Sequence, residues 1–168
     1  SEKVMYLDGA QLADGSLTAT TVVGDFTIVA AAGASVDIEA NAKTADDGTS
    51  YTKRIKLGGA GNFSKRSIHF STTGKATIEV YAMSSTGSVD RSLELYQSDE
   101  TNAIGSVVAY GANLVKGTIE IAEAGDYYLA SPASGVNVYA VKVTVGGSTE
   151  EVDRPSWDSV CLLYTSPS

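Results

Sequence analysis

Hydrophobic and polar residues alternate with a period close to two along most of residues 1–145, and short clusters of Gly, Ser, Asp and Asn interrupt the alternation. This period is typical of strands that turn one face to a core, whereas helices repeat about every 3.6 residues. No segment shows the helical period. The alternation predicts strands at residues 4–7, 20–30, 35–40, 51–57, 64–71, 76–83, 91–97, 104–109, 116–122, 127–131 and 136–145.

The breaks between these segments determine the expected fold class. Turn-forming clusters, such as residues 46–48, 58–62 and 84–90, are short, which favours pairing of strands that are consecutive in the chain. Many short strands at regular spacing are typical of a sandwich or a barrel. We therefore predict an all-β protein, a two-sheet antiparallel β-sandwich that is jelly-roll-like.

The net charge is unevenly distributed along the chain. The 168 residues carry a formal charge of −8 and a pI near 4.5, which argues against the basic surface that nucleic-acid binding requires. Residues 51–91 nevertheless hold seven basic residues against two acidic ones, a net charge of +5, whereas the remainder carries five against 18, a net charge of −13. This segregation predicts a local cationic surface suited to a polyanion with spaced carboxylates.

Composition excludes several classes of chemistry. The chain has one histidine, His69, and one cysteine, Cys161, so it offers no disulfide and no His-rich zinc site. Asp46 and Asp47 could contribute to a structural calcium site, but a calcium ion takes about six to eight oxygens, so two carboxylates do not support one. We therefore assign no metal ligand and expect no cofactor. The chain shows neither a signal peptide nor an apolar run of about 18 residues, and we expect no membrane partner.

Catalysis remains a weaker interpretation than binding. A retaining glycosidase needs only two carboxyl groups about 5 Å apart, so the number of acidic residues does not decide the matter. Most of the Asp and Glu residues fall in predicted turns or after residue 145, however. We therefore predict that the chain is not an enzyme.

Two basic side chains share one face of the segment YTKRIKL at residues 51–57. Alternation places Arg54 and Lys56 on the same side, about 7 Å apart. A guanidinium binds a carboxylate through two hydrogen bonds and an ammonium adds a movable charge, so the pair suits uronic acids. The alternative is a solvated strand face with paired surface charges.

For the other candidate residues, a purely structural role competes with ligand binding. Arg66 and Arg91 are in phase with apolar neighbours, which points them to the edge of the core, where a salt bridge with Asp90 or Glu79 competes with ligand binding. Tyr128 and Tyr139 offer faces for stacking on sugar rings, but aromatic side chains on strands often pack internally instead.

Residues 51–145, about 95 of the 168, carry a resemblance to a known type of module. The segments YTKRIKLGGAG, SKRSIHF, IEVYAMSSTGSVDRSLELY and AGDYYLASPASGVNVYAVKV occur in the expected order. Together they resemble the noncatalytic β-sandwich, carbohydrate-binding-type modules of secreted bacterial pectate lyases and related polysaccharide-degrading enzymes.

The resemblance implies a secreted, extracellular bacterial carbohydrate-binding module that binds homogalacturonan-like plant cell-wall polysaccharide. It also implies a catalytic domain in the same chain, either a polysaccharide lyase or a glycoside hydrolase. The alternatives are a structural spacer and a protein-interaction module. The ligand-binding residues implied by the matching segments are Lys53, Arg54, Lys56, Arg66, Arg91, Tyr128 and Tyr139.

The composition changes after residue 145, which suggests a domain boundary. We expect residues 1–145 to form the module, and the Gly-, Ser- and Glu-rich residues 146–153 to form a linker. Residues 154–160 resemble the start of a fibronectin-like domain. Residues 161–168, CLLYTSPS, back-translate to a string that resembles the end of a transposon-derived sequencing adaptor, so we interpret them as read-through on a metagenomic fragment.

Overall fold

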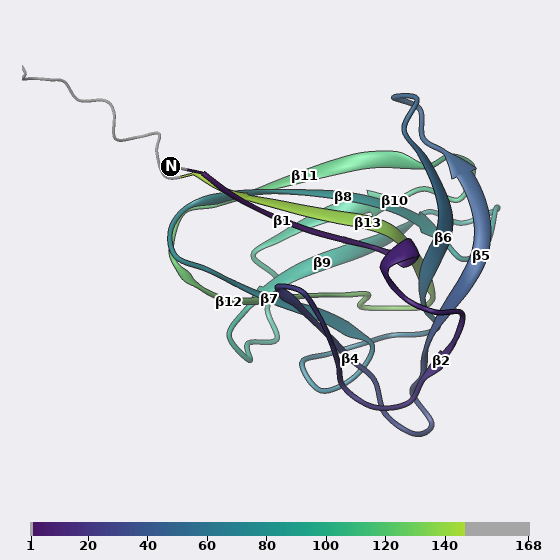
Figure 1. The fold of residues 1–168 in the computed structure, drawn as a ribbon, viewed down its shortest axis with the longest axis horizontal. Coiled ribbons are helices and arrows are strands. Elements are labelled where there is room, and N and C mark those ends of the chain that lie inside the picture. Colours follow the sequence, from purple (N-terminus) through teal and green to yellow (C-terminus); the bar gives the residue numbers. More distant parts are fainter. Residues whose placement is uncertain (1, 147–168) are drawn as a thin grey trace, which may run out of the picture.

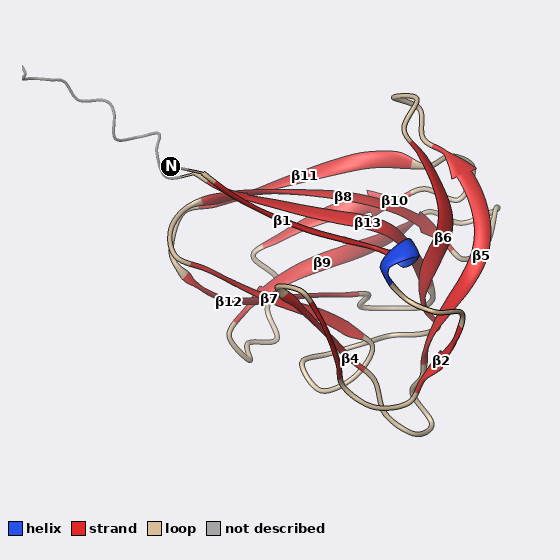
Figure 2. Cartoon of the chain, viewed as in Figure 1, coloured by secondary structure: helices blue, strands red, loops and turns tan. Residues whose placement is uncertain are grey.

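Two antiparallel β-sheets packed face to face make up the protein in the computed structural model, which describes residues 2–146 (Figures 1 and 2). This arrangement confirms the predicted two-sheet antiparallel β-sandwich. In sheet A the strands are β1 (Lys3–Asp8), β2 (Gly15–Leu17), β5 (Val36–Thr44), β6 (Ser50–Leu57), β8 (Ala76–Ser84), β11 (Val115–Ile121) and β13 (Val136–Val145). In sheet B they are β3 (Thr21–Val23), β4 (Phe26–Val29), β7 (Ser67–Thr72), β9 (Arg91–Gln97), β10 (Gly105–Ala109) and β12 (Gly125–Ala130).

The only helical element among the described residues is one 3-10 turn, η1 (Gly9–Gln11), so none of their helices is long enough to cross a membrane. Strand β13 ends at Val145, where the predicted module also ends. The expectations for residues 154–160 and 161–168, and for all of the predicted linker except Gly146, lie outside the described part of the chain.

The prediction missed β2 and ended β5 at residue 40 instead of Thr44. Two further differences follow from local backbone geometry. The segment 20–30 is two strands, β3 and β4, joined by a tight turn in which Gly24 has a φ of +59°. The segment predicted from residue 64 begins as a strand only at Ser67, because Arg66 has a φ of +48°. Positive φ takes a residue out of the extended conformation, and alternation of side-chain polarity does not reveal it.

Alternate residues of both sheets meet in one dry core. Ile55, Leu57 and Val80 of sheet A face Leu93 and Leu129 of sheet B, and all five side chains are fully buried. Burying each such side chain contributes roughly 1.5–3 kcal/mol. This core aligns the two sheets, so the intervening residues of each strand point to an outer face.

Strand β13 holds sheet A together because it shares one of its edges between two partners. β8 pairs along its whole length, whereas β6 pairs with residues 136–138 and β1 with residues 140–145. The register shifts between Val138 and Ala140, so Tyr139 occupies a bulge at the point of exchange. The residues of β6 that precede Ile55 are paired only with β5, and Figure 1 shows the β5–β6 hairpin bending away from the other strands.

At the opposite edge of the sandwich, strands β10 and β11 of the two sheets approach each other closely at two glycines. A Cβ added to Gly117 of β11 would lie 2.5 Å from the Cβ of Val107 in β10, and one on Gly105 would lie 2.7 Å from Cγ2 of Ile119. Any larger residue would force the edge strands of the two sheets apart.

We expect Gly117→Ala to lower the free energy of unfolding by about 1–3 kcal/mol, because overpacking displaces well-packed neighbours. Urea denaturation followed by circular dichroism would measure the change. Gly74→Ala is the matched control, since its added Cβ meets nothing within 4 Å and should change stability by less than about 0.5 kcal/mol. Equal stability of the two variants would contradict the proposed edge packing.

Candidate functional site

The fold separates the seven predicted binding residues. Arg54, Lys56 and Tyr139 lie on or beside the outer face of sheet A, and Arg91 lies at the border of the same region. The other three, Lys53, Arg66 and Tyr128, lie elsewhere. The structure therefore brings four of the residues into one neighbourhood.

A hollow of about 210 Å³ opens on sheet A where β6 leaves β13. Its lining joins the bulge of β13 to the β5–β6 hairpin and to the loop that follows β8. The residues that line it are Asn41, Lys43, Arg54, Met83, Ser84, Ser85, Thr86, Gly87, Gly111, Asn137 and Tyr139.

Glu39 holds Arg54 in place beside this hollow. Its Oε1 accepts a hydrogen bond from Nε of Arg54 at 2.9 Å and lies 2.8 Å from Nη2 in an ion pair. Lys56 lies farther away, with Nζ 4.0 Å from Oε2 of Glu39. A guanidinium has more N–H donors than these two contacts use, so Arg54 is oriented and keeps donors for a ligand.

Tyr139 forms a wall of the hollow. Its side chain is 1% exposed, its hydroxyl donates to Oδ1 of Asn41, and its ring centroid lies 6.5 Å from that of Tyr51. Burial raises the pKa of Tyr139 against the opposing effect of Arg54. The ring is part of a packed cluster with Met83, so it presents no open face for stacking on a sugar.

The amide of Asn137 lies in the same lining with spare hydrogen-bonding capacity. The residue is 5% exposed, and its Oδ1 is buried without a protein partner among residues 2–146. In register it stands between Lys56 of β6 and Met83 of β8. A buried amide oxygen without a partner is costly, so Asn137 is a strained polar position at the border of the hollow.

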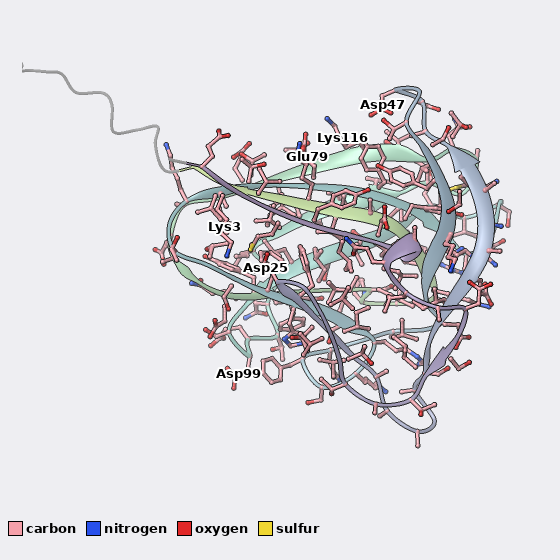
Figure 3. The ribbon with its side chains drawn as sticks, viewed as in Figure 1. Lys3, Asp25, Asp47, Glu79, Asp99 and Lys116 are labelled. Atoms are coloured by element: carbon pink, nitrogen blue, oxygen red, sulfur yellow. The ribbon has the colours of Figure 1, made fainter. Side chains whose placement is uncertain are left out.

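Ion pairs and hydrogen bonds occupy much of the remaining outer face of sheet A (Figure 3). Lys116 lies 2.9 Å from Glu79, and the Tyr81 hydroxyl donates to Oδ2 of Asp47 at 2.6 Å. That hydrogen bond is the main reason why the pKa of Asp47 falls to about 2. Lys43, by contrast, is exposed and has no charged partner among the described residues.

Arg91 is fixed by neutral groups. Its Nη1 donates to Oγ of Ser85 at 2.7 Å and to the carbonyl of Gly135 at 2.6 Å. Glu79 pairs with Lys116, and Asp90 accepts a hydrogen bond from the amide of Gly111. Neither of the salt bridges considered for Arg91 is present, and the guanidinium instead ties the loop after β8 to the turn before β13.

Lys53 and Arg66 have structural surroundings away from the hollow. Nζ of Lys53 donates to the carbonyl of Leu12 at 2.8 Å and lies 2.8 Å from Oδ1 of Asp14. The Arg66 guanidinium packs so closely on Gly59 that an added Cβ there would lie 2.6 Å from Nη1. These contacts anchor the segments on either side of β6.

Tyr128 lies on the outer face of sheet B but is 1% exposed. It is stacked between Tyr96 and His69, with centroid distances of 4.7 and 5.2 Å, and its hydroxyl donates to the carbonyl of Glu100. Protein rings therefore already occupy its faces. The sequence signalled an aromatic residue but not that two neighbouring strands would supply its stacking partners.

The sequence analysis did not select Asn41, Lys43 or Asn137. Nothing in their local pattern distinguishes them, because the hairpin bend and the β13 bulge bring them to the hollow. No group of three His, Cys, Asp or Glu residues suited to holding a metal ion occurs within residues 2–146.

No protein-family model matches the chain, and no curated protein matches it. Similar solved structures include one from work on glycan recognition by the Ruminococcus flavefaciens cellulosome, at 14% identity over 85% of this chain and 94% of that chain, with a TM-score of 0.49. Another is the CBM51 of Clostridium perfringens GH95 in complex with methyl-galactose, at 14% identity over 83% and 99%, with a TM-score of 0.43.

A third is the pair of CBM22-1 and GH10 modules of Clostridium thermocellum xylanase 10B with xylohexaose, at 13% identity over 68% of this chain and 25% of that chain, with a TM-score of 0.44. The structural neighbours are thus carbohydrate-binding modules of glycoside hydrolases and cellulosome components. The association with pectate lyases stays a prediction.

His69 allows a direct check of the stack on sheet B. Its Nε2 lies 2.9 Å from the carbonyl of Phe63, and since a carbonyl only accepts, Nε2 carries the proton of the neutral ring. Burial lowers the pKa of His69 more than the Phe63 carbonyl raises it. The folded protein therefore resists protonation of this ring.

We expect the only histidine of the chain to titrate in NMR spectra with a pKa below its ordinary value of about 6.5. Because the folded pKa lies below the unfolded one, the contribution of His69 to stability is complete above about pH 6.5. It declines as the pH falls toward the folded pKa. His69→Gln should make the unfolding free energy less dependent on pH between 7 and 5. A titration midpoint above 6.5 would refute the assigned environment.

Proposed function

We propose that this chain is a noncatalytic carbohydrate-binding module that binds an anionic, homogalacturonan-like polysaccharide at the hollow beside Tyr139. The proposal places the module in a secreted, extracellular bacterial protein that acts on plant cell walls. A linked catalytic domain would gain by proximity, since tethering raises the local concentration of its substrate.

The lining of the hollow carries the proposal. It contains two cations, Lys43 and Arg54, and no carboxylate, on a protein whose formal charge is −8. A site free of carboxylates on so acidic a surface is suited to an anion. The amides of Asn41 and Asn137 and the hydroxyls of the loop after β8 add partners for sugar hydroxyls.

Arg54 and Lys43 have different parts in this binding. Because Glu39 fixes the guanidinium, Arg54 would meet a uronate carboxylate with less loss of side-chain freedom on binding. Lys43 is an exposed ammonium that moves to follow the ligand. Glu39 also repels the ligand, so the net electrostatic gain is small.

The size of the hollow limits how a polysaccharide is held. Sites for drug-sized ligands enclose about 300–1,000 Å³, so 210 Å³ accommodates a single sugar residue of a chain that runs across the surface. Exposed charge pairs contribute little each and are screened within about 10 Å at 0.1 M salt. We therefore propose weak binding that is sensitive to salt.

Affinity electrophoresis of the full chain tests this function, with polygalacturonan, methyl-esterified pectin or neutral xylan in the gel. We expect retardation by polygalacturonan that declines as salt is added, and the salt dependence separates it from binding of a neutral polymer. Lys43→Gln combined with Arg54→Gln should abolish it, because the carboxylate of the sugar then meets no cation in the hollow. Mobilities are compared with gels that contain no polysaccharide.

The control variant is Lys75→Gln, which removes one charge from an exposed position that does not line the hollow. It should be retarded like the unaltered protein. If the control variant lost as much retardation as the double variant, attraction by the total charge would be indicated and a localised site contradicted. Free migration of the unaltered protein in all three gels would overturn the proposed function and favour the structural spacer.

A further inference from the structure

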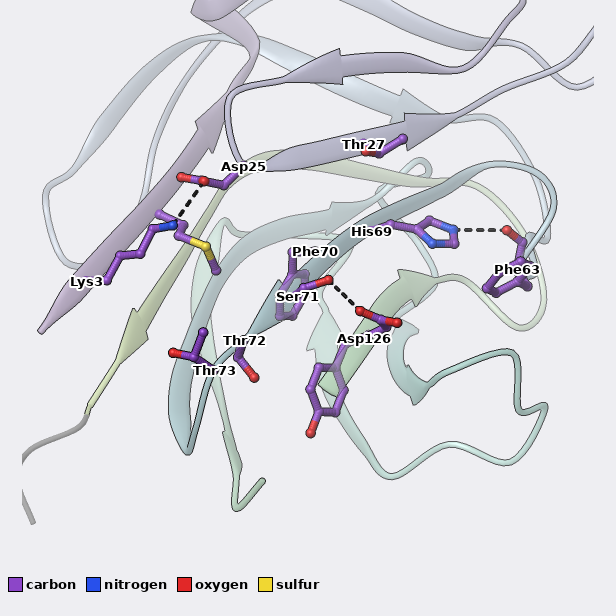
Figure 4. Close-up of a pocket in the computed structure, with 12 residues that line it drawn as sticks. Lys3, Asp25, Thr27, Phe63, His69, Phe70, Ser71, Thr72, Thr73 and Asp126 are labelled. Atoms are coloured by element: carbon purple, nitrogen blue, oxygen red, sulfur yellow. Dashed lines mark hydrogen bonds and ion pairs between the residues drawn. The ribbon is translucent and has the colours of Figure 1, made fainter. Parts of the chain in front are cut away.

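A second and larger cleft, of about 460 Å³, lies on the side of the molecule formed by sheet B (Figure 4). β4 pairs with β7 only from Thr27 to Val29, so the residue before Thr27 on the outer face, Asp25, has no partner on β7. The two strands diverge there and leave the cleft open. An ion pair between Lys3 and Asp25, at 3.3 Å, closes one end, and Phe63 stands at the other.

The floor of this cleft is apolar and one wall is an exposed aromatic ring. Met5, Phe70 and Tyr127 form the floor, and each is almost fully buried. Phe63 is 43% exposed, although its ring packs against His69 at a centroid distance of 5.0 Å and an angle of 74°. An aromatic residue held from one side and open on the other suits an apolar ligand surface.

The polar groups around the floor are mostly hydrogen-bond acceptors. Since Nε2 of His69 donates to the Phe63 carbonyl, the neutral ring leaves Nδ1 as an acceptor, and it has no partner within residues 2–146. Asp126 accepts from Ser71 through Oδ1 at 2.6 Å, while its Oδ2 has no such partner. The hydroxyl of Thr27 is also unpaired within the described chain, so it can donate or accept.

The charges in this lining differ from those in the hollow on sheet A. Lys3 and Asp25 neutralise each other, and the lowered pKa of His69 keeps its ring neutral at pH 7. Asp126 is then the one unpaired charge of the lining, and it is negative. A uronate would be repelled here, whereas a neutral molecule rich in hydroxyl groups would find acceptors.

We propose that this cleft is a second binding site, for an uncharged sugar residue. A pyranose has an apolar face of C–H groups and a rim of hydroxyls. The C–H face lies against Phe63, and hydroxyls donate to Asp126 and to Nδ1 of His69. The site shares no residue with the hollow around Arg54. Binding of a neutral sugar at the cleft and binding of an anion at the hollow can therefore be tested and disproved independently.

NMR titration of the full chain with cellohexaose, xylohexaose and trigalacturonate tests the inference. At least one neutral oligosaccharide should shift the ring signals of His69 and the amide signals of Thr27, Ser71 and Asp126. Trigalacturonate should leave these signals in place. Phe63→Ala should weaken neutral binding about tenfold, and Thr27→Val, which keeps the shape but removes the hydroxyl, about two- to tenfold.

Two controls separate loss of the site from loss of the fold. Tyr6→Ala removes an aromatic side chain of similar exposure on sheet A and should bind the neutral sugar as before. Thr27→Val should keep the pKa of His69 and the retardation in polygalacturonan, while Lys43→Gln should keep neutral-sugar binding. The inference is overturned if no neutral oligosaccharide shifts the signals of the cleft residues. It is also overturned if Thr27→Val and Phe63→Ala bind the neutral oligosaccharide as tightly as the unaltered protein does.

Discussion

The exchange of partners along one edge of β13 is the constraint on which the sandwich and its candidate site depend. Hydrogen bonding occupies both edges of this strand, one by β8 and the other by β6 and then β1. An extra residue, Tyr139, is accommodated at the exchange as a bulge, and bulges bend a strand and re-aim side chains. Because β6 separates from β13 at this point, a hollow opens between the β5–β6 hairpin and β13.

The same exchange explains why the basic residues of β6 have such different surroundings. From Ile55 to Leu57 the strand is confined between β5 and β13, so Lys56 is one member of a row across the sheet. Arg54 lies just past the exchange, where the bulged Tyr139 and the lining of the hollow surround it. Lys53 points to the opposite side and fixes the segment around Asp14. Adjacent charges in the sequence thus serve separate purposes.

The two outer faces of the sandwich offer complementary electrostatics. On sheet A the lining of the hollow holds two cations and no carboxylate, although Glu39, outside the lining, pairs with Arg54 and reduces the net positive charge there. On sheet B the unpaired charge of the cleft is the carboxylate of Asp126, and an aromatic ring stands beside it. A module built in this way would hold different sugars of one heterogeneous polysaccharide at two places, which increases avidity without a deep pocket.

The sequence by itself determined most of the strands, the sandwich and most of the core. Burial of one face of a strand requires apolar residues at every second position, and residues such as Ile55 and Leu57 show this period. It also determined that cations concentrate between residues 51 and 91. Only the tertiary structure decided that Tyr128 is sealed between two rings, that Glu39 engages Arg54, and that Lys43 and Asn137 meet at one hollow. These contacts join residues far apart in the chain through strand pairing, a bulge and diverging edges, and local periodicity carries no information about such pairings.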